Sequence, residues 1–309
     1  MILATQRGCE VRNRFPGSIV AFAAAVGVVS LTPAPAVAQA PAAAAATTWA
    51  PPRTPDGQPD IRGFWIVPDE AGNNGGAQWS IEGSTSRLSL TSGELTRARS
   101  SKIVDPADGK IPYQPWAAKK AREHFDNHTY PTKPEYVDGR TRCYLPGVPR
   151  QIWSATGGYQ IVQTPGYVIM MVEFSHAYRI IPLDGSPHVG ETIKLFQGDS
   201  RGHWEGNTLV VDVTNNNDRT WFDQVGDFHS DAMHVVERFT AVDPDTIKYE
   251  ATIEDPKAYT RPWKIVFTVS RNKEPGFELM EHSCHEGERA AQRFLSYTSS
   301  AEETSQKTK

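Results

Sequence analysis

The segment between residues 221 and 238 carries the densest group of side chains able to exchange protons. It contains His229, Asp231 and His234 behind the aromatic Trp221. Histidine and carboxylate groups are the usual proton donors and acceptors near neutral pH. The first part of the segment reads as a loop that enters a strand, and loops at a barrel mouth commonly carry function. We therefore predict that His229, Asp231 and His234 are acid/base groups; the alternative is a polar loop followed by one solvent-facing histidine.

A second group lies near the end of the chain, where His285 and Glu286 directly follow Cys284. His285 and Glu286 form a further candidate acid/base pair. A cysteine between histidines is also typical of metal sites in cytosolic proteins, whereas in an exported protein a disulfide is expected. Solvated surface charge is the remaining alternative for this group.

A third group runs from residue 173 to residue 179. His176 and Tyr178 share one face of a predicted strand with apolar neighbours. Such a pair is usually a hydrogen-bonded part of the core, and the alternative is that it lines a cavity for an aromatic ligand. On the second alternative we predict that Glu173, His176, Tyr178 and Arg179 bind substrate together with Trp221.

Several familiar signatures are absent from the sequence. It contains no Gly-x-Ser-x-Gly elbow, no phosphate loop, no dinucleotide fingerprint and no His-Glu-x-x-His. The formal charge of −4 argues against nucleic acid as a partner, because phosphate binding needs a basic surface. We therefore predict a small-molecule partner and no cofactor. A divalent metal held by His229, His234 and His285 is the alternative use of the histidines.

The first forty residues have the three-part layout of a secretory signal peptide. Arginines precede an apolar run over residues 19–31, and Ala38 and Ala40 occupy the small-residue positions of a cleavage site. The apolar run is shorter than the ~20 residues of a membrane span. This layout predicts a periplasmic or secreted protein with no membrane span after cleavage.

Two cysteines, Cys143 and Cys284, follow the predicted cleavage site. In an exported protein such a pair forms a disulfide more often than it stays reduced. A bridge between them would close a long loop and stabilise the fold by about 4–5 kcal/mol in the chain-entropy model. Two buried thiols are the alternative.

Short runs of β-branched and aromatic residues alternate with turn residues from residue 158 onward. No region shows the strand–helix alternation of a parallel sheet. The pattern predicts a mainly β fold, a single antiparallel barrel (lipocalin-like) or a sandwich. The predicted strands are 159–164, 167–174, 177–182, 192–196, 208–214, 234–240, 249–254, 263–270 and 277–282.

The residues before this β region have a weaker pattern. A capping box predicts a helix over residues 91–102, and Pro115 opens a second helix over residues 116–124. We predict a single β domain in which an irregular, partly helical segment covers a β core. The predicted divisions are a signal peptide (1–40), a flexible Ala/Pro tether (41–59), the domain (60–298, with covering layer 60–151 and core 158–298) and a disordered tail (299–309).

Six distinctive stretches suggest a family relationship. They are Cys143-Tyr-Leu-Pro-Gly-Val-Pro-Arg150, Gln160-Ile-Val-Gln-Thr-Pro-Gly-Tyr-Val168, Arg179-Ile-Ile-Pro-Leu-Asp-Gly185, Gly198-Asp-Ser-Arg-Gly-His-Trp-Glu-Gly-Asn-Thr-Leu-Val-Val211, His234-Val-Val-Glu-Arg-Phe239 and Cys284-His-Glu-Gly287. With these stretches the chain resembles a family of uncharacterised exported bacterial proteins. The resemblance transfers no activity, so it assigns no role to any residue.

These observations lead to three hypotheses about function. The first is an exported enzyme that performs acid/base chemistry of the lyase, isomerase or hydrolase type. Its substrate would be a small apolar or aromatic molecule bound in a β-barrel cavity. The second is a non-catalytic periplasmic protein that binds a small apolar ligand, and the third is a His-ligated metal protein.

Overall fold

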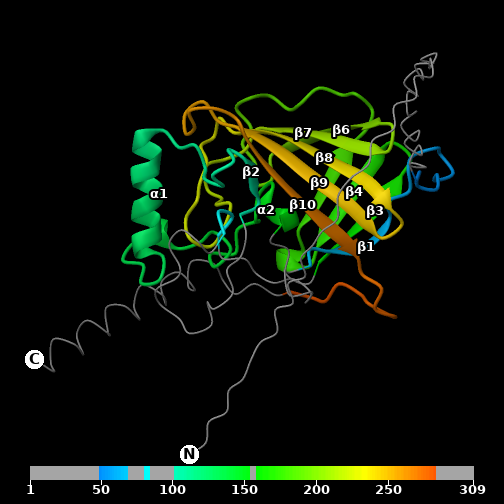
Figure 1. Cartoon of the computed structure of the whole chain (residues 1–309), viewed down its shortest axis with the longest axis horizontal. Helices are drawn as coiled ribbons and strands as arrows, with labels where there is room; N and C mark the ends of the chain where they lie inside the picture. The colour runs from blue at the N-terminus through cyan, green and yellow to red at the C-terminus, as the bar shows by residue number, and fades with distance from the viewer. Residues whose placement is uncertain (1–48, 69–79, 84–100, 154–157, 283–309) are drawn as a thin grey trace, which may run out of the picture. The chain divides into compact units, whose positions relative to one another are not determined.

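The computed structural model describes residues 49–68, 80–83, 101–153 and 158–282, all within one compact unit, Thr48–Lys309 (Figure 1). Several predictions therefore lie outside the described residues: the signal peptide, most of the helix over 91–102, the tail, Cys284, His285 and Glu286.

Ten antiparallel strands form one sheet that curls into a nearly closed barrel. The strand order is β5-β4-β3-β1-β10-β9-β8-β7-β6. In addition, β2 pairs with the beginning of β10, at Lys264 and Ile265. The two end strands, β5 and β6, lie beside each other. The prediction of a mainly β, antiparallel barrel is confirmed. The strands are β1 (Gly63–Ile66), β2 (Ile103–Asp105), β3 (Tyr159–Thr164), β4 (Tyr167–Val172), β5 (Tyr178–Pro182), β6 (Asp199–Glu205), β7 (Thr208–Thr214), β8 (His234–Asp243), β9 (Thr246–Glu254) and β10 (Trp263–Arg271).

Alternation of side chains along each strand builds the barrel interior. On β8, Val235, Glu237 and Phe239 are fully buried, whereas His234 and Arg238 lie on the outer face. Successive residues of a strand point to opposite faces of the sheet, so this period-two pattern decides which side chains enter the core. His234 and Glu237 therefore face opposite sides of the strand.

Within residues 158–282, two of the predicted strands are wrong, and one real strand was missed. Residues 192–196 form a turn and a single bridge between Leu195 and Asn216, and residues 277–282 are irregular. The strand that was missed is β6, which pairs with β7 along its whole length. Its polar residues and Gly202 have low β propensity. The glycine is required there because an added Cβ would lie 2.7 Å from the side chain of Ile181.

The residues before the β core contribute more than a cover. Strand β1 lies between β3 and β10 and so belongs to the barrel itself. The predicted second helix is present as α1 (Pro115–Asn127), and a short α2 (Arg150–Trp153) precedes β3. Figure 1 shows α1 at one end of the sheet, with loops between it and the strands. Trp49, in the segment predicted as a tether, packs against the core.

No helix in the described ranges is long and apolar enough to cross a membrane.

Candidate functional site

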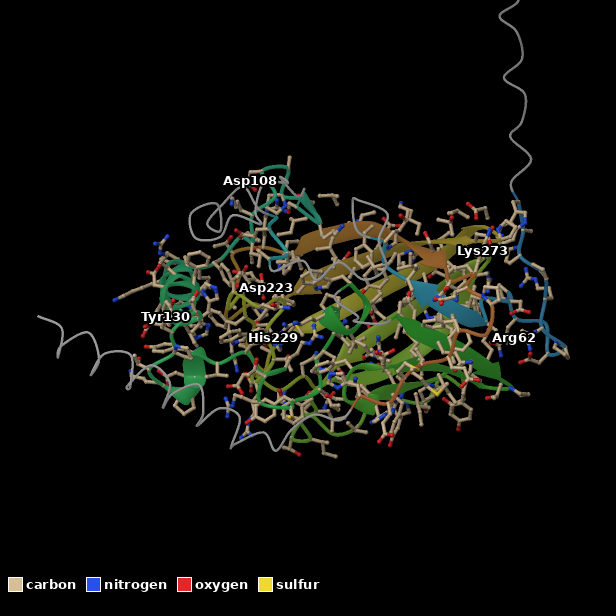
Figure 2. The ribbon with its side chains drawn as sticks, turned by 90° about the horizontal axis from the view of Figure 1, so that it is seen from below. Arg62, Asp108, Tyr130, Asp223, His229 and Lys273 are labelled. Carbon is tan, nitrogen blue, oxygen red and sulfur yellow. The ribbon has the colours of Figure 1, made fainter. Side chains whose placement is uncertain are left out.

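A cleft of about 660 Å³ lies between α1 and the loop that connects β7 to β8. Four aromatic side chains form much of its wall, and it contains a single histidine, His124. Figure 2 shows Asp223 and His229 of the same loop between α1 and the strands. The lining residues are Lys120, Glu123, His124, Glu135, Tyr136, Val137, Arg142, Tyr144, Asp218, Arg219, Trp221 and Phe228.

His124 is held in one orientation and one tautomer. It belongs to the buried side of α1 with Ala117 and Ala121, and it is only 5 % exposed. Its Nδ1 atom lies 3.0 Å from the carbonyl oxygen of Gly226 and must donate its hydrogen to that oxygen. The only hydrogen bond of His124 to another described residue is this one through Nδ1, so Nε2 forms none within that part of the chain. In the neutral ring, Nε2 therefore keeps its lone pair, and the ring lines the cleft.

Burial keeps the imidazole of His124 unprotonated. Desolvation lowers the pKa of His124, and the hydrogen bond to Gly226 only partly opposes this effect. The ring also stacks on Trp221, with 4.9 Å between ring centroids and 25° between planes. Trp221 was one of the predicted substrate-binding residues, and it lines this cleft.

Asp223 shapes the loop that carries the Gly226 carbonyl. Its Oδ1 atom accepts the backbone N–H groups of Val225, Gly226 and Asp227 at 3.0–3.1 Å. Its Oδ2 atom accepts the N–H of Ile81 at 3.1 Å. Burial raises the pKa of Asp223, although these hydrogen bonds oppose the increase. The Asp223 carboxylate thus fixes the backbone of the loop in the position where the Gly226 carbonyl accepts the hydrogen bond from His124.

Gly226 permits the close approach of this loop to α1. Its φ angle is +98°, a value that residues other than glycine rarely adopt. A Cβ at this position would lie 2.3 Å from the Cβ of His124. Any other residue would therefore push His124 and the loop apart.

Charged groups surround the aromatic walls of the cleft. The Lys120 ammonium lies 4.5 Å from the centre of the Phe228 ring, a cation–π arrangement. The Tyr136 hydroxyl donates to Glu123, and this hydrogen bond lowers the pKa of Glu123. Arg219 contributes a second exposed cation. The cleft therefore combines aromatic faces and an unprotonated imidazole with three basic and three acidic side chains.

His229 lies behind this cleft and does not line it. The side chain is 2 % exposed, and its Nε2 accepts the hydroxyl of Thr220 at 2.7 Å. Its Nδ1 donates to the carbonyl of Ser230 at 2.9 Å. Burial lowers the pKa of His229, so the ring is neutral. Both ring nitrogens form hydrogen bonds, so the ring links Thr220 to the part of the loop around Ser230.

Asp231 and His234 lie at separate places on the outer surface. Asp231 forms an exposed ion pair with Lys257 at 2.6 Å. His234, on the outer face of β8, lies 2.8 Å from Asp212. His188 also contacts Asp212 at 2.8 Å. The structure does not bring His229, Asp231 and His234 into one cavity; it instead brings His234 together with His188, which the sequence analysis did not single out.

The predicted substrate-binding residues divide between two sides of the sheet. Glu173, His176 and Tyr178 line a second cavity, of about 880 Å³, on the outer face of β3, β4 and β5. Arg179 points the other way, into the barrel, and is 3 % exposed. Alternation along β5 separates Tyr178 from Arg179.

Arg179 belongs to a polar cluster inside the barrel. Its guanidinium donates to Glu237 and, through Nε, to the Ser200 hydroxyl at 2.8 Å. Tyr249 donates to the other oxygen of Glu237 at 2.7 Å. Burial raises the pKa of both Tyr249 and Tyr159, and the nearby Glu237 charge acts in the same direction. The two charged members of the cluster, Arg179 and Glu237, are paired with each other, as buried charges must be.

No group of three metal-ligating side chains is placed to hold an ion within the part of the chain that the structure describes. The proposed metal set of His229, His234 and His285 includes one residue outside that part. The two described members have different partners, Thr220 and Asp212.

Comparison of the chain with protein-family models, with curated protein sequences and with solved structures gave no match.

The sequence analysis missed His124, which is the histidine that faces the cleft. The available signal was helical spacing, because Ala117, Ala121 and His124 follow one another at intervals of four and three residues. A histidine on the apolar stripe of a short helix has to find a hydrogen-bond partner when it is buried. Its partner Gly226 is 102 residues away, and no local pattern points to it.

Proposed function

We propose that the protein is an enzyme that performs acid/base chemistry on a small planar molecule bound in the His124 cleft. The observation that carries the proposal is the orientation of His124. One ring nitrogen is fixed by Gly226, the other forms no hydrogen bond within the described residues, and the ring lines a cavity of about 660 Å³. Such a nitrogen is suited to accept a proton from a bound substrate.

The walls of the cleft support an aromatic substrate. Flat side chains favour a flat ligand, because stacked and edge-on ring pairs add to the energy of buried area. The volume falls within the range of small-molecule sites. Lys120 and Arg219 line the same cleft and would stabilise negative charge left on the substrate after proton transfer. Proton abstraction from carbon, as in a lyase or isomerase, fits this combination.

We also propose that the protein is exported and that Cys143 pairs with Cys284. The leader pattern supports export. Arg140, three residues before Cys143, lies 4.1 Å above the Phe174 ring. The ring of His282, two residues before Cys284, lies 4.7 Å from the same ring. The two cysteine segments thus approach a common side chain. Mass spectrometry of the secreted protein without reductant tests both proposals. The N-terminal residue shows whether the leader was cleaved, and a mass lower by two hydrogens shows that the disulfide has formed.

Hydrogen–deuterium exchange tests the proposed chemistry without knowledge of the natural substrate. Acetophenone and phenylacetone carry exchangeable C–H groups next to a carbonyl and fit the size of the cleft. Catalysed exchange in D₂O, followed by proton NMR, should fall at least about 100-fold in His124→Gln. His203→Gln is the matched control, because His203 is an exposed histidine outside the cleft.

The same experiment separates an enzyme from a binding protein. Saturable quenching of tryptophan fluorescence by these ketones, with no exchange above that of buffer, would assign binding alone. Exchange that is equally fast in His124→Gln and in the wild type would remove His124 from the mechanism. Exchange lost in His124→Gln but kept in His203→Gln would support it.

A further inference from the structure

The outer face of β3, β4 and β5 is apolar, unlike the rest of the barrel surface. Ile169 on β4 pairs with Ile180 on β5, and Met171 pairs with Tyr178 in the next row. Ile180 is 49 % exposed and Tyr178 is 65 % exposed. The outer faces of β8, β9 and β10 instead carry charged residues such as Arg238, Lys248 and Lys264. Apolar side chains gathered on an outer face indicate a binding surface.

The segment after β10 turns this face into a groove. Phe277 packs edge-on against Phe64 of β1, with 5.3 Å between ring centroids. The backbone N–H of Met280 donates to Glu173 at 3.2 Å. The groove between this segment and the strands has a volume of about 880 Å³. It shares no lining residue with the His124 cleft.

The charged groups of the groove all have the same sign. Glu173, Glu278 and Glu281 line it, and none of its described lining residues is Lys or Arg. His176 also lines the groove, and its Nε2 accepts the backbone N–H of His282 at 3.3 Å. The groove is therefore apolar along its floor and negative along its rim.

We infer that this groove binds a small amphipathic cation, a molecule with an apolar body and an ammonium group. The apolar body would cover Ile169, Met171 and Ile180 and remove them from water. The ammonium group would lie between the carboxylates of Glu278 and Glu281. The exposed ring of Tyr178 offers a cation–π face beside them. An amphipathic anion of the same length would contact the same apolar floor, but the carboxylates of the rim would repel its charged group.

Calorimetric titration with two ligands of equal length tests this inference. Octylammonium chloride and sodium nonanoate carry the same eight-carbon alkyl chain and opposite charges. We expect octylammonium to bind about fivefold more tightly or better, since two exposed carboxylates each add a modest attraction. Equal binding of the two ligands, or tighter binding of nonanoate, would overturn the inference.

Variants show whether the preference arises at this rim. The double variant Glu278→Gln/Glu281→Gln should bind the two ligands about equally. Glu274→Gln is the control: it removes one carboxylate from the same exposed segment outside the groove and should keep the preference. Ile180→Lys places a cation on the floor and should abolish octylammonium binding. A double variant that keeps the full preference, or tight octylammonium binding by Ile180→Lys, would contradict the inference. Thermal unfolding of each variant verifies that it is folded.

Discussion

At the scale of single residues, the barrel interior depends on one carboxylate that is completely paired. Glu237 is fully buried and accepts hydrogen bonds from Arg179 and Tyr249. Two atoms near it have no partner among the described residues, the Tyr159 hydroxyl and Nη1 of Arg179. An ion pair in such a place is sensitive to the loss of one partner, because the other charge stays buried without compensation.

Arg179→Met is therefore expected to destabilise the protein by about 3–5 kcal/mol. The double variant Arg179→Met/Glu237→Leu removes both charges and is expected to recover most of that loss, since apolar residues of similar volume can replace a buried pair. Urea unfolding of the wild type and both variants measures the two free energies. A double variant no more stable than Arg179→Met would show that the pair is not the source of the effect.

At the scale of elements, the cleft depends on how closely α1 approaches the loop between β7 and β8. Asp223 and His229 hold that loop through hydrogen bonds to its own backbone and to Thr220. Arg150, the first residue of α2, ties the same loop to Asp138 by donating to the Trp221 carbonyl at 3.4 Å and to Asp138 at 2.7 Å. The helix supplies His124, and the loop supplies the carbonyl that orients it.

Gly226→Ala tests this contact between the helix and the loop. The added Cβ would overlap His124, so we expect both a loss of stability and a loss of proton exchange. Gly206→Ala is the matched control, because Gly206 also has a positive φ, +61°, but nothing lies within 4 Å of its added Cβ. The control should cost only about 1–2 kcal/mol from backbone strain. Equal stability and equal exchange rates for the two variants would argue against a tight contact at Gly226.

At the scale of the whole molecule, buried histidines make stability depend on pH. Burial lowers the pKa of both His124 and His229 relative to the unfolded chain. Below about pH 6.5 the unfolded chain therefore binds more protons than the folded one, and the free energy of unfolding decreases as the pH falls. Asp223 acts in the opposite direction: its raised pKa makes the folded state less stable as the pH rises above the ordinary value for aspartate.

His229→Gln isolates one part of this pH dependence. The variant lacks one of the two histidines, so its unfolding free energy should decrease less steeply than that of the wild type as the pH falls from about 6.5. Urea unfolding at several pH values gives both slopes, and the contribution of Asp223 cancels in their difference. Parallel curves for the two proteins would mean that His229 does not take up a proton on unfolding.

Much of the barrel was predictable because the local sequence of most strands has the composition and pattern typical of β structure. Thr208–Thr214 is a run rich in β-branched residues, and Trp263–Arg271 combines β-branched and aromatic residues with period-two alternation. β6 was missed because its residues have low intrinsic preference and become a strand only by pairing with β7. Residues 277–282 were wrongly predicted for the converse reason, since an apolar run can pack against a sheet without pairing with it.

The sequence by itself determined the class of fold, the inward and outward residues of most strands, and the residue types available for proton transfer. Only the tertiary structure decided which of those residues meet. His124 faces Gly226 across 102 residues, whereas His229 and His234 are five residues apart and point to different surroundings. The reason is physical: alternation and propensity act between near neighbours, but burial and hydrogen bonding act between whatever segments the barrel brings together.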